Sequence, residues 1–174
     1  VGSCLTRCNN VRDAPHTGIN AMTLYASLLF LHLLAATFWV GGMACMHFAV
    51  RPSAVARLDP PQRLPFMTAA LGRFFDGVTA AIVVILVTGL AMIFGRGGIG
   101  AAHWSVHAMF TLGLVMMAVF GHIRWAAYPR LQRAVASSEW KAAAPALDGI
   151  RRLVAVNLGL GVVVYGIATV GRVL

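Results

Sequence analysis

Four long apolar stretches constrain the fold of this chain more than any other feature. They cover residues 24–50, 74–94, 106–125 and 153–173, and each contains at most one Lys, Arg, Asp or Glu. A helix needs about 20 apolar residues to cross the hydrocarbon core of a bilayer, which is about 30 Å thick. A β-barrel would instead show short segments of alternating polarity. The sequence therefore predicts an all-α integral membrane protein, a bundle of four transmembrane helices.

The overall composition supports this fold class. Of the 174 residues, 59% are hydrophobic and only 11% are charged, which is too apolar for a soluble domain of this size. The segments between the spans are too short to hold a soluble domain, so residues 22–174 are predicted to form a single transmembrane domain. Residues 1–21 are a polar tail, and Met22 is a candidate natural start, which would make that tail non-native.

The distribution of positive charge predicts the topology. Ten of the 14 Lys and Arg residues lie in the two loops that follow the first and third spans. Positively charged loops stay in the cytoplasm, so both termini are expected outside, in the periplasm of a bacterium whose inner membrane holds this multi-pass protein. The net charge of +9 therefore indicates topology, with the lipid bilayer as the partner and no role in binding nucleic acid.

Four histidines in the spans are the first candidates for chemistry, because ionisable residues inside a bilayer are costly and commonly functional. His32 and His47 lie in the first span and His107 and His122 in the third, each pair 15 residues apart. Both spans run from outside to inside, so the histidines form an outer pair and an inner pair about 22 Å apart along the helix axis.

Paired imidazoles from two helices are typical of b-type haem sites. We therefore predict one or two haems, with His32 and His107 as the outer axial ligands and His47 and His122 as the weaker inner pair. The alternative is that the outer histidines bond neighbouring Ser, Thr or backbone groups, while the inner histidines reach the headgroups.

The haem hypothesis assigns roles to neighbouring residues. Trp39 would pack near the cofactor, Gly42 would let the macrocycle approach, and Arg51 and Arg124 would pair with propionates. Glycines in membrane helices also serve packing, and arginines also anchor to lipid phosphate. The predicted activity is electron transfer with a redox partner or within a larger membrane complex, and whether the chain is an oxidoreductase stays open.

A second hypothesis is Cu(I) binding. Met43, Met46 and His47 share one helical face at the i, i+3, i+4 spacing, and Met116 lies at a comparable depth in the third span. Thioether and imidazole ligands suit Cu(I). Methionine is also a common apolar filler, and a cofactor-free structural subunit is a third possibility.

Proline and glycine mark the predicted loops. The first loop contains four prolines, Pro52, Pro60, Pro61 and Pro65. They favour a turn, which we expect to be followed by a short interfacial helix over residues 66–73. The third span is predicted to end at Tyr128-Pro129, before an amphipathic helix over residues 131–150. The glycine-rich turn at residues 95–100 needs unusual backbone angles.

Two polar residues are given structural roles. Asp76 at the inner start of the second span is expected to pair with Arg73 or a loop arginine. Asn157 in the fourth span is expected to hydrogen-bond between helices.

Short motifs in the spans resemble known families. The first span contains His32, Trp39 and Gly42 and is followed by Arg51-Pro52; the later motifs are Thr88-Gly89-Leu90 and Trp104-Ser105-Val106-His107. This pattern resembles the copper-resistance D (CopD) family, and the His, Trp and Gly spacing is also similar to HemJ-type protoporphyrinogen oxidases. The resemblance implies a small polytopic inner-membrane protein connected with copper uptake or with haem and porphyrin redox chemistry.

One position departs from the families' pattern. At the start of the third span those families tend to have a lysine, whereas this chain has His107. The difference weakens the transfer of the oxidase activity, and it supplies the second imidazole that a bis-histidine haem would require.

Overall fold

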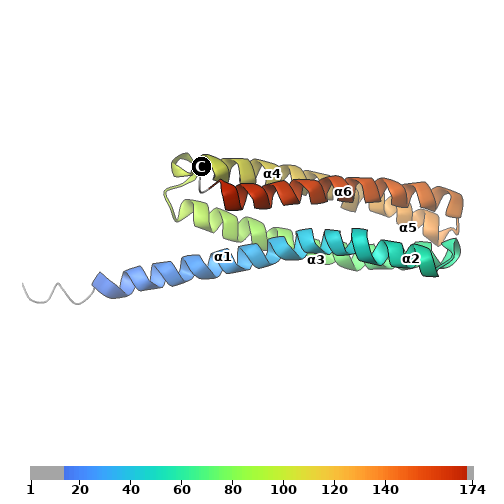
Figure 1. Ribbon diagram of the computed structural model, residues 1–174, viewed down its shortest axis with the longest axis horizontal. Helices are drawn as coiled ribbons and strands as arrows, with labels where there is room; N and C mark the ends of the chain where they lie inside the picture. The colour runs from blue at the N-terminus through green and yellow to red at the C-terminus, as the bar shows by residue number, and fades with distance from the viewer. Residues whose placement is uncertain (1–13, 172–174) are drawn as a thin grey trace, which may run out of the picture.

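The computed structural model describes residues 14–171. All regular secondary structure in this part of the chain is helical (Figure 1). The elements are α1 (Ala14–Cys45), a first π turn (Met46–Val50), α2 (Arg51–Arg57), α3 (Pro60–Phe94), a 3-10 turn (Ile99–Ala101), α4 (Trp104–His122), a second π turn (Ile123–Ala127), α5 (Tyr128–Ala136) and α6 (Trp140–Val170). Four helical stretches are long and apolar enough to cross a membrane. The all-α prediction with four spans is confirmed.

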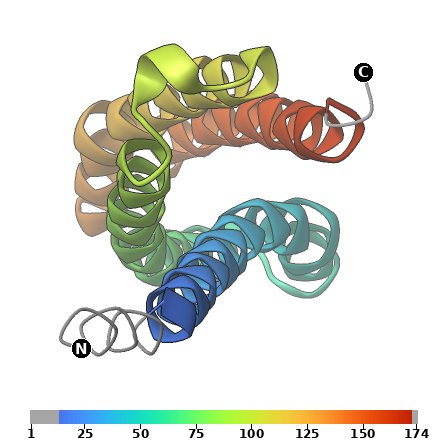
Figure 2. The same cartoon turned by 90° about the vertical axis from the view of Figure 1, so that its left-hand side faces the viewer.

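The spans are arranged as two antiparallel hairpins. α1 packs along α3, and α4 packs along α6, while α6 also contacts α1 and α3. Figure 2, which looks along the bundle from the end of the glycine-rich turn, shows α1 and α4 on opposite sides of the arrangement. The two hairpins therefore meet mainly through α6.

Large apolar side chains cover the outside of the described bundle. Phe30, Phe48, Val87, Trp125 and Val162 are each 60% or more exposed. Such a surface would be unfavourable in water but is normal against lipid tails. Figure 1 places α2 and α5, which adjoin the two basic loops, at one end of the bundle and the turn between α3 and α4 at the other. Which end faces the cytoplasm stays a prediction from the charge distribution.

The second span begins earlier than predicted. α3 starts at Pro60 and runs unbroken to Phe94, so the interpretation of residues 66–73 as a separate interfacial helix is wrong. Proline is tolerated in the first turn of a helix because the backbone N–H groups there have no intrahelical partner. Asp59 O accepts the N–H groups of Gln62 and Arg63, and Pro65 leaves only one helical bond unmade.

Other element boundaries also differ from the predictions. The third span continues through the second π turn into α5, and the chain breaks at residues 137–139, where Ser138 has a φ of 57°. A continuous helix over residues 131–150 is therefore wrong. α1 begins at Ala14, inside the predicted tail, whose residues 1–13 lie outside the described part. The unusual backbone angles predicted for the glycine-rich turn are confirmed by positive φ values at Gly97 (98°) and Gly98 (86°).

The two π turns occur at similar places in the two hairpins. The N–H of Arg51 bonds to Met46 O and that of Tyr128 bonds to Ile123 O, so each turn contains one residue more than an α-helical turn. In both cases the next residue is a proline, which lacks an N–H group and cannot extend the α-helical ladder. Each span therefore widens at the end of the bundle where the basic loops begin.

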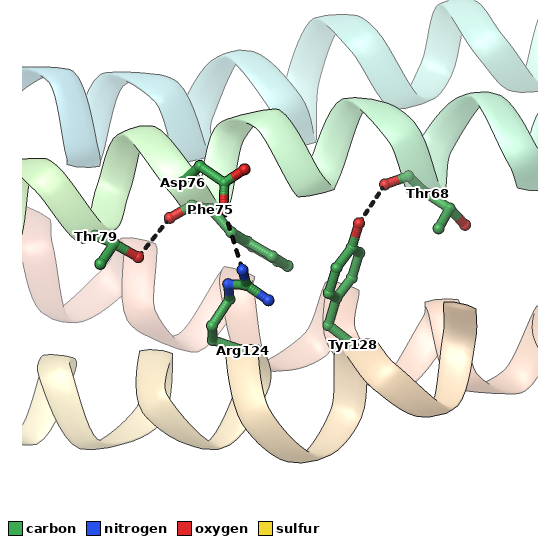
Figure 3. A network of polar contacts seen from close by, with 6 residues as sticks. All are labelled: Thr68, Phe75, Asp76, Thr79, Arg124 and Tyr128. Carbon is green, nitrogen blue, oxygen red and sulfur yellow. Dashed lines mark hydrogen bonds and ion pairs between the residues drawn. The ribbon is translucent and has the colours of Figure 1, made fainter. Parts of the chain in front are cut away.

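A polar network fastens α3 to the second π turn and α5 (Figure 3). The Tyr128 hydroxyl donates to Thr68 O at 3.0 Å, and Arg124 Nη2 lies 3.1 Å from Asp76 Oδ1. The partner of Asp76 is thus Arg124 rather than Arg73. Because the carboxylate is 70% exposed, this ion pair contributes little, and the buried tyrosine bond is the stronger link.

Candidate functional site

A cavity of about 140 Å³ lies at the end of the bundle that carries α2. Its walls come from the first π turn and α2, from the first third of α3, and from the first half of α6. Three of the four spans therefore contribute to it. Its lining combines apolar side chains with four kinds of group that carry chemistry: two thioethers, one imidazole, three guanidinium groups and one carboxylate.

The soft donors of the cavity are Met46, His47 and Met67. Met46 and His47 are the first two residues of the first π turn and are half-buried. Met67 is buried on α3, which places a second thioether opposite that turn. A neutral set of two thioethers and one imidazole is a combination that suits Cu(I).

A buried amide lies on α6 about one turn beyond Val154, the last α6 residue of the cavity lining. Asn157 is 1% exposed, and its Nδ2 donates to Met43 Sδ at 3.9 Å, which confirms the expected hydrogen bond between helices. Its Oδ1 has no hydrogen-bond partner among the described residues. A buried carbonyl oxygen without a donor is unfavourable, so this position is able to accept an additional polar or cationic partner.

Met116 belongs to α4 and packs against Gly161 of α6, one helical turn beyond Asn157. A Cβ placed on Gly161 would come within 2.8 Å of Val40 Cγ2 and 3.3 Å of Met116 Cε, so α1 and α4 both approach α6 there. Asn157 and Gly161 are four residues apart, or roughly 6 Å along the helix. The structure therefore places Met43 and Met116 against neighbouring turns of α6.

Of the four residues predicted for copper, Met46 and His47 line the cavity, whereas Met43 and Met116 are buried in the core and do not line it. Cys45 is exposed and does not line the cavity. Met67 was missed because residues 66–73 were predicted to form a separate interfacial helix outside the second span. Its signal was present in the sequence, since Leu64, Met67, Leu71, Phe75 and Val78 repeat at helical spacing and are all buried.

The outer histidine of the first span has a partner on α3. His32 Nδ1 lies 2.9 Å from Thr88 Oγ1, and the Thr88 hydroxyl lies 2.6 Å from Val84 O. Because a hydroxyl has one proton and Thr88 gives it to Val84, the imidazole Nδ1–H is the donor to Thr88. The alternative in which His32 bonds a neighbouring threonine is thus observed.

The other histidines of the haem hypothesis are not brought together. His107 and His122 are exposed on α4, which packs mainly along α6, whereas His32 and His47 lie on α1 and its π turn. A haem ligated between the first and third spans is not supported by this arrangement, and the pairing stays a prediction.

Trp39 and Gly42 serve packing in this structure. Trp39 is buried with its ring 6.1 Å from that of Phe120, in an edge-to-face arrangement. A Cβ on Gly42 would clash with the ring of Phe74. The close approach that Gly42 allows is therefore that of α3 rather than of a macrocycle.

The cavity is positively charged. Arg51, Arg63 and Arg151 contribute guanidinium groups to its lining, and Asp148 contributes one carboxylate. Among the side chains that the structure describes, no group of three or more His, Cys, Asp or Glu residues is arranged to hold a metal ion. Any cation in the cavity would depend on thioether and imidazole donors and on an anion that offsets the arginines.

Comparison with known proteins identifies the family. The model of the family described as CopD, copper resistance protein D, matches residues 68–170, which is more than half of the chain. The match covers most of α3 and all of α4, α5 and α6. Neither the curated proteins nor the solved structures gave a match. The chain therefore belongs to the copper resistance protein D family, and it is a multi-pass membrane protein of that family.

Proposed function

We propose that this protein binds Cu(I) as cargo in the membrane, at the cavity that the first π turn, α2, α3 and α6 enclose. The observation that carries the proposal is the presence of Met46, His47 and Met67 in the lining of one cavity. The membership of the CopD family, whose description refers to copper resistance, supports a copper-related role.

The chemistry of the three donors favours Cu(I) over harder ions. Thioether sulfur and imidazole nitrogen are soft or intermediate ligands, and none of the three carries a formal charge when the imidazole is neutral. Mg²⁺ and Ca²⁺ prefer oxygen ligands, which Met46, His47 and Met67 lack. The three side chains come from two elements, so the packing of α1 against α3 determines whether they act together.

The row of methionines beyond the cavity extends the proposal from binding to transfer. Met43 and Met116 lie against Asn157 and Gly161 on consecutive turns of α6, and the free Oδ1 of Asn157 lies in the same layer as Met43. A cation moving from the cavity toward the bundle interior would meet thioethers and a carbonyl oxygen at intervals of roughly one turn.

The test is a competition titration with a chromophoric Cu(I) chelator under anaerobic, reducing conditions. We expect wild-type protein in detergent to take up Cu(I), and we expect Met46→Leu combined with Met67→Leu to weaken the affinity by about a hundredfold or more, since losing even an outer-shell partner costs about 10–100-fold. Leucine keeps the apolar volume of methionine, so the fold should persist.

The matched control replaces two methionines outside the cavity. Met92 and Met109 are half-buried near the opposite end of α3 and α4, and their change to leucine should leave Cu(I) affinity unaltered. The copper proposal fails if the wild-type protein takes up no Cu(I), or if the double variant at the cavity binds as tightly as this control.

The haem prediction is checked on the same preparation. Two imidazoles on one iron would give the sharp bands of a low-spin b haem in the dithionite-reduced absorption spectrum. These bands should then disappear in His32→Ala and persist in His16→Ala, which changes a histidine outside the predicted spans. A folded, colourless protein from haem-replete cells would contradict haem binding while leaving the copper titration unaffected.

A further inference from the structure

The same cavity holds more positive than negative charge. Its guanidinium groups come from three different helices: Arg51 begins α2, Arg63 lies in the first turn of α3, and Arg151 lies in α6. Asp148 is the one carboxylate of the lining, and it is shared, because Arg151 Nη2 lies 2.6 Å and Arg152 Nη2 2.9 Å from its two oxygens. Among the described side chains, neither Arg51 nor Arg63 has an ion-pair partner.

Arg151 also has an unused donor. Its Nε is buried and has no hydrogen-bond partner within the described residues, although its Nη2 is engaged by Asp148. A buried N–H without an acceptor is costly, and more so when it belongs to a cation. An acceptor located in the cavity would remove this cost and would also reduce the repulsion among the three guanidinium groups.

We propose that this cavity binds a phosphate group held by Arg51, Arg63 and Arg151. The guanidinium fork matches the oxygens of phosphate and forms short, charge-assisted hydrogen bonds with it. A cavity of about 150 Å³ accepts a molecule as large as benzene, so one of about 140 Å³ has room for the smaller phosphate group.

Two sources could supply such a group. The cavity lies at the end of the bundle that is predicted to meet the cytoplasmic headgroups, and Leu64, Leu71 and Val154 give it an apolar wall that the glycerol region of a phospholipid could contact. Free inorganic phosphate is the other source. The inference stands on the arginines and does not require copper, although a bound anion would offset the charge that opposes a cation near His47.

The experiment measures thermal unfolding of delipidated protein in a phosphate-free, non-ionic detergent with a copper chelator present. The probes are inorganic phosphate and phosphatidylglycerol, each compared with chloride at equal ionic strength or with uncharged diacylglycerol. We expect the unfolding midpoint to rise with the concentration of a phosphate-bearing probe, as mass action requires for a ligand of the folded state. A rise with phosphatidylglycerol alone identifies the lipid as the source, and a rise with both probes identifies the phosphate group itself.

The decisive variants are Arg63→Gln and its charge-matched control Arg57→Gln, which changes an exposed arginine of α2 that does not line the cavity. We expect Arg63→Gln to weaken the apparent affinity for the probe by about tenfold or more and Arg57→Gln to leave it unchanged. Because Arg63 has no acidic partner among the described side chains, its variant should fold at least as well without a probe. The proposal is overturned if neither probe stabilises the wild-type protein, or if both variants respond as the wild type does.

Discussion

Replacing Phe75 with alanine is expected to destabilise the folded bundle by roughly 3–5 kcal/mol. Phe75 is 1% exposed on α3, and its ring lies 5.8 Å from that of Phe120 and 5.3 Å from that of Tyr128, both in edge-to-face geometry. The change would leave a cavity between the hairpins and remove two aromatic contacts. Thermal unfolding in detergent, followed by circular dichroism, measures the loss.

Phe94→Ala is the matched control for this change. Phe94 lies on the same helix and is 67% exposed, so its ring contacts lipid or detergent instead of protein. Removing it should change the free energy of unfolding by no more than about 0.5 kcal/mol, as is usual for surface positions. Equal losses for the two variants would mean that the aromatic cluster does not hold the two hairpins together.

The second large effect is expected at Gly161. A Cβ there would lie 2.8 Å from Val40 Cγ2, closer than packed carbon atoms approach, and the rest of a leucine side chain would push α1 and α4 away from α6. We expect Gly161→Leu to destabilise the bundle by about 1–3 kcal/mol, as overpacking of a close contact does. The same unfolding assay gives the value.

A control on the same helix separates packing from helix propensity. Gly159 has no atom within 4 Å of an added Cβ. Because leucine favours a helix over glycine by roughly 0.5–1 kcal/mol, Gly159→Leu should be neutral or slightly stabilising. A gain in stability for both variants would show that α6 does not need its close approach to Val40.

The spans and their order could be predicted from hydrophobic length alone, because lipid requires about 20 apolar residues in each crossing helix. Which helices pack against one another could not be predicted in this way. The equal spacing of His32 to His47 and of His107 to His122 indicates only depth, whereas the rotation of each helix decides which faces meet. The prediction therefore identified histidines at comparable depths on helices that pack with other partners.

The cavity was hidden from sequence reasoning for a related reason. The prolines of the first loop were interpreted as marking a turn, but Pro60 and Pro61 begin α3, so Met67 and Arg63 belong to its helix and not to a loop. Asn157 was predicted to bond between helices, yet its partner, the sulfur of Met43, lies 114 residues away in the sequence and could not be identified from spacing. Contacts between residues so distant in sequence depend on how the two hairpins dock.

The two π turns occupy similar places, between α1 and α2 and between α4 and α5, but their side chains make different contacts. When their first residues are superposed in sequence, His47 corresponds to Arg124, and Arg51 corresponds to Tyr128. In the second hairpin, Arg124 forms the ion pair with Asp76 and Tyr128 donates to Thr68 O, so both side chains bind this π turn to α3. In the first hairpin the same positions face the cavity, with no such bond among the described side chains. Local unfolding should therefore occur more readily in the first hairpin, at the π turn that lines the cavity. The second hairpin would then stay rigid while the first admits a ligand.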